Sequence, residues 1–184
     1  MRSAQGQDVS LLLDTGSGLA WTQCKPCTKH CFKQRGDDAG CISSKCAYYI
    51  DYVDSAYTNG LWSTEKLTLT NGANTLVIDG YNLGCGFNNS AAAGDDQGLE
   101  GASGILGLDR STLSFISQMP ASFNKHFSYC LSSSGSSPGY ITFGKTAEDI
   151  KDFPLVLGNV QQRGIDVHYD VANGRLGFAP GSCS

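Results

Sequence analysis

The stretch Val9-Ser10-Leu11-Leu12-Leu13-Asp14-Thr15-Gly16-Ser17-Gly18 decides how the rest of the chain is interpreted. The apolar residues before Asp14 predict a strand that ends at the aspartate, and the glycine-containing sequence after it predicts a tight loop. Gly16 lets backbone N–H groups approach the carboxylate, while the Thr15 and Ser17 hydroxyls can donate further hydrogen bonds. The stretch therefore predicts an ionised carboxylate held at a strand end.

A carboxylate in this setting is typical of aspartic peptidases. These enzymes pair two carboxylates around one water and share one proton between them, because two like charges that close cannot both ionise readily. One carboxylate acts as base toward the water and the other as acid toward the carbonyl. One Asp-Thr-Gly-Ser tetrapeptide is also compatible with an ordinary turn after a strand, so the flanking residues must decide.

The composition favours an all-β fold. The 184 residues include 23 glycines, eight tyrosines and eight phenylalanines, and only 16% are charged, which favours short strands joined by tight turns. The net charge is −4, and the basic residues Lys25, Lys29, Lys33 and Arg35 are scattered. Nucleic acid is therefore not expected as a partner. No stretch approaches the ~18 apolar residues of a membrane span, so no membrane partner is expected.

The eight cysteines predict disulfides and an oxidising compartment, either secreted or vacuolar. Residues Met1 to Ser10 contain no apolar run, so we expect the signal peptide to be absent or removed upstream. Asn88-Asn89-Ser90 is an acceptor triplet for N-glycosylation, which agrees with a secretory route. The disulfide candidates are Cys24, Cys27, Cys31, Cys41, Cys46, Cys85, Cys130 and Cys183.

Zinc is the alternative for the first five cysteines. Cys24-x2-Cys27 with Cys31, Cys41 and Cys46 could bind the metal in a reducing cell, although the spacing has no second close pair. The histidines at positions 30, 126 and 168 are isolated in sequence, and we assign them no functional role.

The remaining pattern predicts strands separated by turns. Residues 22–46 are polar and cysteine-rich, which indicates an insert that needs crosslinks. Residues 47–70 predict a hairpin with its turn at Thr58-Asn59-Gly60. Further expected elements are a turn at Asn71-Gly72, strands at 76–78, 83–87, 103–108, 127–131 and 140–143, a short helix at 112–119, and tail strands within 153–178 around turns at Gly158-Asn159 and Asn173-Gly174.

Several ordered motifs share a resemblance that extends along almost the whole chain. They are Leu13 to Cys27, with Trp21 after the Asp14 loop, Cys46-Ala47-Tyr48-Tyr49-Ile50-Asp51-Tyr52, Gly84-Cys85-Gly86-Phe87, Gly104 to Arg110, Phe127 to Leu131, and the tail motifs from Leu157 to Arg163, His168 to Asp170 and Gly177 to Ala179. In this order they resemble the plant nepenthesin-like family of pepsin-type aspartic peptidases.

The resemblance implies a pepsin-like acid protease lobe, all-β, with orthogonally packed sheets and a flap hairpin. Residues 1–150 would form the N-terminal catalytic lobe, with a cysteine-rich insert at about 22–46 and a flap at about 47–62, and residues 151–184 a remnant of a truncated C-terminal lobe. Asp14 would be catalytic, Tyr52 would cover the substrate and Trp21 would support the Tyr52 hydroxyl. The implied substrate is a peptide or protein, with no metal or cofactor.

Some features depart from the family. Val53 and Ser55 stand where the family places glycines after the flap tyrosine, which predicts a stiffer flap tip. The segment Ser3 to Gln7 replaces the strand that normally precedes the loop, so an edge of the lobe is expected to be open. Asp54 and Asp109 do not sit in a strand-to-Thr/Ser-Gly turn, and we interpret them as flap or loop residues. If Cys130 and Cys183 pair, they would tie the tail to the main lobe.

The chain carries one catalytic motif. Among its aspartates only Asp14 lies in Asp-Thr-Gly or Asp-Ser-Gly, and the missing second loop would fall near Phe153 to Val156. Three hypotheses follow. Two copies could form the catalytic dyad as a homodimer. The chain could be an inactive peptide-binding or inhibitory module. It could also be a truncated product that folds poorly because apolar surface is uncovered.

Overall fold

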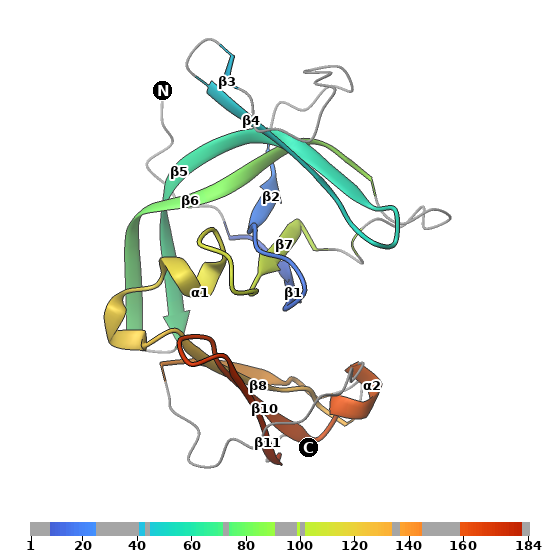
Figure 1. The fold of residues 1–184 in the computed structure, drawn as a ribbon, viewed down its shortest axis with the longest axis vertical. Coiled ribbons are helices and arrows are strands. Elements are labelled where there is room, and N and C mark those ends of the chain that lie inside the picture. The colour runs from blue at the N-terminus through green and yellow to red at the C-terminus, as the bar shows by residue number, and fades with distance from the viewer. Residues whose placement is uncertain are drawn as a thin grey trace. The chain divides into compact units, whose positions relative to one another are not determined.

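The computed structural model of the chain describes residues 8–24, 41–42, 45–71, 74–90, 99, 102–133, 137–144 and 159–181. These residues form strands β1 to β11 with only short helical turns, which confirms the expected all-β class. The chain divides into two compact units, unit 1 over Met1–Gln118 and unit 2 over Met119–Ser184. Figure 1 shows the order of the elements. No helix among the described residues is long and apolar enough to cross a membrane.

Unit 1 is built on one seven-stranded sheet with the order β1-β7-β2-β6-β5-β4-β3. The pairs β1–β7 and β2–β6 are parallel, and the other neighbours are antiparallel. Figure 1 shows β5 and β6 as a long bent hairpin. The elements are β1 (Leu11–Asp14), β2 (Trp21–Gln23), β3 (Cys41–Ile42), β4 (Lys45–Asp51), β5 (Tyr57–Asn71), β6 (Asn74–Ser90), β7 (Gly104–Gly107) and α1 (Phe115–Gln118).

The core of unit 1 lies between β2, β4 and β7. Leu19, Trp21, Tyr48 and Ile105 are buried together, with the half-buried Ile50, Tyr52, Trp62 and Leu99 packed against them. Tyr48, Ile50 and Tyr52 alternate along the chain, as expected for one face of a strand and its extension. The even-numbered side chains from Tyr48 to Tyr52 therefore lie on the core face as the chain approaches the flap.

The predicted turn at Thr58-Asn59-Gly60 is wrong, because these residues lie inside β5. The turn spans Tyr52–Ala56, where Tyr52 N–H donates to the Ala56 carbonyl at 2.8 Å. Gly60 marks a bulge, since the register shifts between Asn59 and Gly60, and a Cβ there would lie 1.9 Å from the Cys85 carbonyl oxygen. Gly60 is therefore required by the close approach of two backbones and not by a turn.

The two strands predicted at 76–78 and 83–87 are also wrong as separate elements. They belong to β6, which continues through the interruption at Gly80. Gly80 has φ of +73°, and the register with β5 shifts here, between Glu65 and Leu67. A glycine in the left-handed region lets the strand absorb an extra residue without ending.

Within the described residues the other local predictions agree with the structure, except the turn predicted at Gly158-Asn159. Asn71 pairs with Asn74, which closes the hairpin at the predicted Asn71-Gly72 turn. The strand within 103–108 and the helix within 112–119 are confirmed by β7 and α1. In the tail, Asn173-Gly174 lies in the turn between two strands, whereas Asn159 begins a helix. The tail strand expected from Phe153 lies outside the described residues.

Unit 2 is a four-stranded antiparallel sheet with the order β11-β10-β8-β9. Its strands β8 and β9 confirm the strands predicted at 127–131 and 140–143, and they share the sheet with the tail strands. The proposed division of the chain near residue 150 concerns ancestry and stays a prediction. The elements are η1 (Ala121–Phe123), β8 (His126–Cys130), β9 (Tyr140–Phe143), α2 (Asn159–Gln162), β10 (Ile165–Asp170) and β11 (Arg175–Pro180).

Aromatic rings and a buried contact between His126 and Asp170 stabilise this second sheet. The Phe127 and Tyr169 rings lie opposite each other and stack with centroids 4.5 Å apart. Tyr129, which lies opposite Val167, stacks diagonally on Tyr169. His126 and Asp170 face each other across β8 and β10, with Nε2 and Oδ1 3.0 Å apart and both side chains buried. His126 therefore has a structural partner in unit 2.

Candidate active site

The Asp14 loop is fixed by backbone contacts with the segment that follows β7. β1 runs parallel to β7 with Asp14 opposite Gly107. Beyond the pair, Leu108 N–H donates to the Asp14 carbonyl at 2.8 Å, and Asp109 N–H donates to the Ser17 carbonyl at 3.0 Å. The sequence analysis did not predict that residues 108 and 109 hydrogen-bond the Asp14 loop. The apolar strand pattern that precedes these two residues was the only indication.

The Asp14 carboxylate accepts a hydrogen bond on each oxygen. Gly16 N–H donates to Oδ1 at 2.9 Å, and the Ser17 hydroxyl donates to Oδ2 at 2.5 Å. Two donors, one on each oxygen, fix the plane of the carboxylate. Thr15 is half-buried and has no side-chain hydrogen bond among the residues that the structure describes. The side chain of Asp14 is thus oriented by its own loop.

Tyr52 and Trp21 lie at this same site. Trp21 is buried on β2, and its Nε1–H donates to the Tyr52 hydroxyl oxygen at 2.8 Å. Burial raises the pKa of Tyr52, the hydrogen bond from Trp21 lowers it, and the charge of Asp14 raises it again. A hydrogen bond with Ser17 also acts on this hydroxyl. The raised pKa keeps the phenol neutral, so its proton stays available for donation.

These contacts form one hydrogen-bonded chain from Asp14 through Ser17 and Tyr52 to Trp21. The four residues come from the end of β1, the loop after it, the flap turn and β2. They are brought together by the sheet, because β2 lies beside β7 and β7 lies beside β1. The arrangement places the Asp14 carboxyl group in the same network as the neutral Tyr52 phenol.

The flap turn is organised by its own polar groups. Ser55 N–H donates to the Tyr52 carbonyl at 3.0 Å, and the Asp54 carboxylate accepts from Ala56 N–H at 2.9 Å. Asp54 therefore stabilises the turn. Val53 is fully exposed at the tip, and Ser55 has φ of 70°. A serine in the left-handed region costs about 1 kcal/mol or more.

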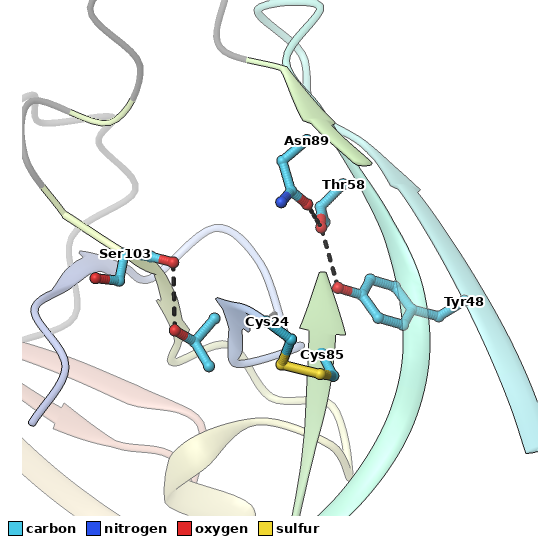
Figure 2. Close-up of a disulfide and its surroundings, with 7 residues drawn as sticks. Cys24, Tyr48, Thr58, Cys85, Asn89 and Ser103 are labelled. Carbon is cyan, nitrogen blue, oxygen red and sulfur yellow. Dashed lines mark hydrogen bonds between the residues drawn. A yellow bond between two sulfur atoms is a disulfide. The ribbon is translucent and has the colours of Figure 1, made fainter. Parts of the chain in front are cut away.

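A disulfide joins the chain after β2 to β6. Cys24 and Cys85 are bonded across a sequence separation of 61, as Figure 2 shows. Cys46 and Cys130 are disulfide-bonded as well. A cysteine in a disulfide is not a thiolate ligand, so the zinc alternative is wrong for Cys24 and Cys46. Cys27, Cys31, Cys183 and the side chain of Cys41 lie outside the described residues, and so does the suggested Cys130–Cys183 pair.

No group of three or more His, Cys, Asp or Glu side chains is placed to hold a metal ion within the described ranges. Among the described residues, Asp14 is the carboxylate at a strand end whose charge acts on the flap tyrosine Tyr52. This fold, a curled β sheet with a hairpin flap, is that of a pepsin-like acid protease lobe.

Comparison with known proteins agrees with this class. The family profile described as "Xylanase inhibitor N-terminal" matches residues 28–145. An aspartyl protease family protein of Arabidopsis thaliana is 40% identical over 80% of this chain and 36% of its own length. The aspartyl protease AED1 of the same plant is 35% identical over 96% of this chain and 42% of its own length. The aspartic proteinase nepenthesin-1 of Nepenthes gracilis is 32% identical over 78% of this chain and 36% of its own length.

The chain belongs to the plant nepenthesin-like family of pepsin-type aspartic proteases. It spans between about a third and two fifths of the length of these curated relatives. Among solved structures, conglutin gamma from lupine seeds aligns with a TM-score of 0.49 and 18% identity, over 71% of this chain and 40% of that protein.

Proposed function

We propose that this chain supplies one half of an aspartic peptidase site that hydrolyses peptide bonds in protein substrates. Asp14 contributes one carboxylate, and a second copy of the chain contributes the other. The observation that carries this proposal is the hydrogen-bonded chain from Asp14 through Ser17 and Tyr52 to Trp21. It connects the Asp14 carboxylate, which is proposed to bind the water, to the neutral Tyr52 hydroxyl on the flap.

The proposed reaction uses each group once. The ionised carboxylate takes a proton from a bound water as the water oxygen attacks the peptide carbonyl carbon. The second carboxylate, protonated, donates to the carbonyl oxygen and stabilises the developing charge. Collapse of the tetrahedral intermediate breaks the C–N bond, and a carboxyl proton passes to the leaving amine. Tyr52 covers the substrate with its phenol hydrogen-bonded and neutral.

The second carboxylate is proposed to come from another copy because the 184 residues contain one Asp-Thr-Gly or Asp-Ser-Gly motif. A two-fold dimer would place two Asp14 side chains on its axis, since such an interface brings the same surface of both copies together. Both carboxylates would then share one proton, as a close pair of like charges requires.

The second candidate function is peptide binding without hydrolysis. The chain contains one Asp-Thr-Gly motif, so catalysis would require a dimer. A chain with one motif could instead keep half of a substrate cleft and bind peptides or inhibit an enzyme. The matching family profile is named after a xylanase inhibitor, which supports a non-catalytic use of the same lobe. A third possibility is a truncated product that aggregates.

We further propose a secreted or vacuolar location. The disulfides at Cys24–Cys85, Cys46 and Cys130 support it, because structural disulfides persist in oxidising compartments.

The test measures cleavage of an unfolded protein at acid pH as a function of chain concentration, with and without pepstatin. We expect the rate to rise with the square of chain concentration below the dimer dissociation constant, and to vanish in Asp14→Asn. In mixtures, the rate should follow the square of the wild-type fraction, because a mixed dimer has one carboxylate. Asp79→Asn, an exposed carboxylate on β6, is the matched control and should keep full activity.

The alternatives give different results in the same samples. Peptide binding seen by calorimetry, with no cleavage at any concentration, would favour the binding function. A rate linear in chain concentration, or activity in Asp14→Asn, would rule out the shared site. Aggregation in size-exclusion chromatography would indicate the truncated product.

A further inference from the structure

We propose that Asn88 is a glycosylation site and that its glycan stands on the outer face of the sheet beside the flap hairpin, away from the Asp14 site. The inference goes beyond the proposed peptidase function and rests only on the proposed secretory location. Asn88-Asn89-Ser90 is the one acceptor triplet in the 184 residues. Such triplets are frequent by chance, so the geometry must carry the argument.

The triplet lies at the end of β6 and alternates between the two faces of the sheet. Asn88 and Ser90 are exposed. Asn89 between them is half-buried, and its Oδ1 accepts from the Thr58 hydroxyl at 2.6 Å. Figure 2 shows this contact continuing from Thr58 to the Tyr48 hydroxyl. The two residues that define an acceptor therefore point outward, while the middle residue anchors the strand.

The Asn88 side chain presents its amide nitrogen. Its Oδ1 accepts from the Tyr57 hydroxyl at 3.4 Å, whereas Nδ2 has no partner among the residues that the structure describes. Nδ2 is the atom that carries the sugar in an N-glycan. The hydrogen bond to the oxygen thus leaves the reactive nitrogen of this exposed side chain available.

The neighbouring outer face suits a sugar. Asn88 pairs with Asn59 and Ser90 pairs with Tyr57 across the sheet, so these side chains share one face. The Tyr57 ring stacks on Tyr49, with centroids 6.1 Å apart. An aromatic pair with hydroxyl tips offers both an apolar surface and polar groups to the first sugar residue.

The opposite face belongs to the core. Tyr48, Ile50 and Tyr52 point inward and pack near Trp21, whereas Tyr49 is exposed on the other side of β4. Because side chains alternate along a strand, a glycan on Asn88 extends away from Tyr52 and the Asp14 carboxylate. The modification is therefore compatible with peptide binding under the flap.

The transfer requires an oligosaccharide carried on a polyprenyl pyrophosphate. The Nδ2 nitrogen attacks C1 of the first sugar, the C1–N bond forms, and the bond from C1 to the pyrophosphate oxygen breaks. The amide loses one proton, and the polyprenyl pyrophosphate leaves with the electron pair. No oxidant or reductant is involved.

The test expresses the full chain with an added secretion leader in eukaryotic cells and maps glycopeptides by mass spectrometry, before and after peptide N-glycosidase. We expect Asn88 to carry the glycan and to be converted to aspartate by the enzyme. Asn88→Gln and Ser90→Ala should lose the modification completely. Ser90→Thr should retain it, and Asn59→Gln, which changes a neighbour on the same face, should leave it unchanged.

Two results would overturn the inference. One is secreted, folded wild-type protein that has the Cys24–Cys85 disulfide and an unmodified Asn88. The other is a glycan that persists in Asn88→Gln. Ser90→Ala guards against a folding failure of Asn88→Gln, because it removes the acceptor and keeps the asparagine. Failure of the peptidase proposal is seen separately, in the cleavage assay on the same glycosylated chain.

Discussion

At the scale of single residues, the two units use carboxylates in different ways. Asp14 is half-buried and accepts from its own loop, which leaves part of the carboxylate open to a ligand. Asp170 is 4% exposed and accepts from Asn173 N–H at 2.9 Å, from Asn173 Nδ2 at 2.7 Å, and from His126. A carboxylate so fully occupied holds a turn and a strand pair together, and is not free to bind water.

The Asp170 contacts predict a pH dependence for unit 2. Burial by itself would raise the pKa of Asp170, but hydrogen bonds from Asn173 and His126 hold it below its ordinary value. A lowered folded-state pKa gives stability that is present above the unfolded value and is lost as pH falls through the folded value. Unit 2 should therefore lose stability below about pH 4.

The variant Asp170→Asn tests this dependence. It should cost about 3 kcal/mol near neutral pH, because His126 loses a buried partner, and the remaining stability should change less in acid. Thermal unfolding followed by far-UV circular dichroism measures the effect. Asp166→Asn on the same strand is the control and should behave like the wild type. Equal acid sensitivity of Asp170→Asn and wild type would contradict the assignment.

At the scale of elements, the β5–β6 hairpin depends on two glycines with different roles. Gly60 permits close approach of the two backbones, whereas Gly80 supplies a left-handed conformation in open space. Both interrupt the regular register, and each lets a long strand bend without ending. The bent hairpin in turn connects the flap turn to the strands that border the Asp14 loop.

The difference between the glycines can be measured. Gly60→Ala should cost about 3 kcal/mol, because the added methyl meets the Cys85 backbone and the strands must separate. Gly80→Ala should cost about 1 kcal/mol, the price of a left-handed alanine without a clash. Urea unfolding followed by tryptophan fluorescence reports both, since Trp21 and Trp62 lie in unit 1. A larger loss for Gly80→Ala would contradict the interpretation.

At the scale of the whole molecule, the chain consists of two compact units, each with its own sheet. The Cys24–Cys85 disulfide lies entirely within unit 1, as do both tryptophans and the Asp14 site. Unit 2 contains the His126–Asp170 pair and the disulfide-bonded Cys130. The stability of the Asp14 site in unit 1 and the stability of the four-stranded sheet in unit 2 are therefore expected to depend on different contacts.

Removal of the first disulfide should affect unit 1 selectively. The double variant Cys24→Ala with Cys85→Ala should lose about 4 kcal/mol in the transition seen by tryptophan fluorescence, because a long loop of unfolded chain is no longer closed. Hydrogen exchange of the β8 and β10 amides should stay unchanged. Equal loss of protection in both units would show that they unfold as one.

The sequence predicted well what depends on neighbouring residues. The strand that ends at Asp14, the turns at Asn71-Gly72 and Asn173-Gly174, and the strands near β7, β8 and β9 follow from side-chain alternation and turn chemistry. The even cysteine count indicated disulfides, and Cys24, Cys46, Cys85 and Cys130 are bonded. These features are local or compositional, so the sequence alone determined them.

Other features were decided only by the tertiary structure. Gly60 lies in a bulge and not in a turn, because a glycine before folding signals either a turn or a close approach, and only the position of Cys85 distinguishes the two. The contact of Ser17 and Trp21 with Tyr52 depends on β1, β7 and β2 lying side by side. The sequence by itself thus determined the Asp14 loop and the hydrogen bonds within it, and long-range strand pairing decided which distant residues surround it.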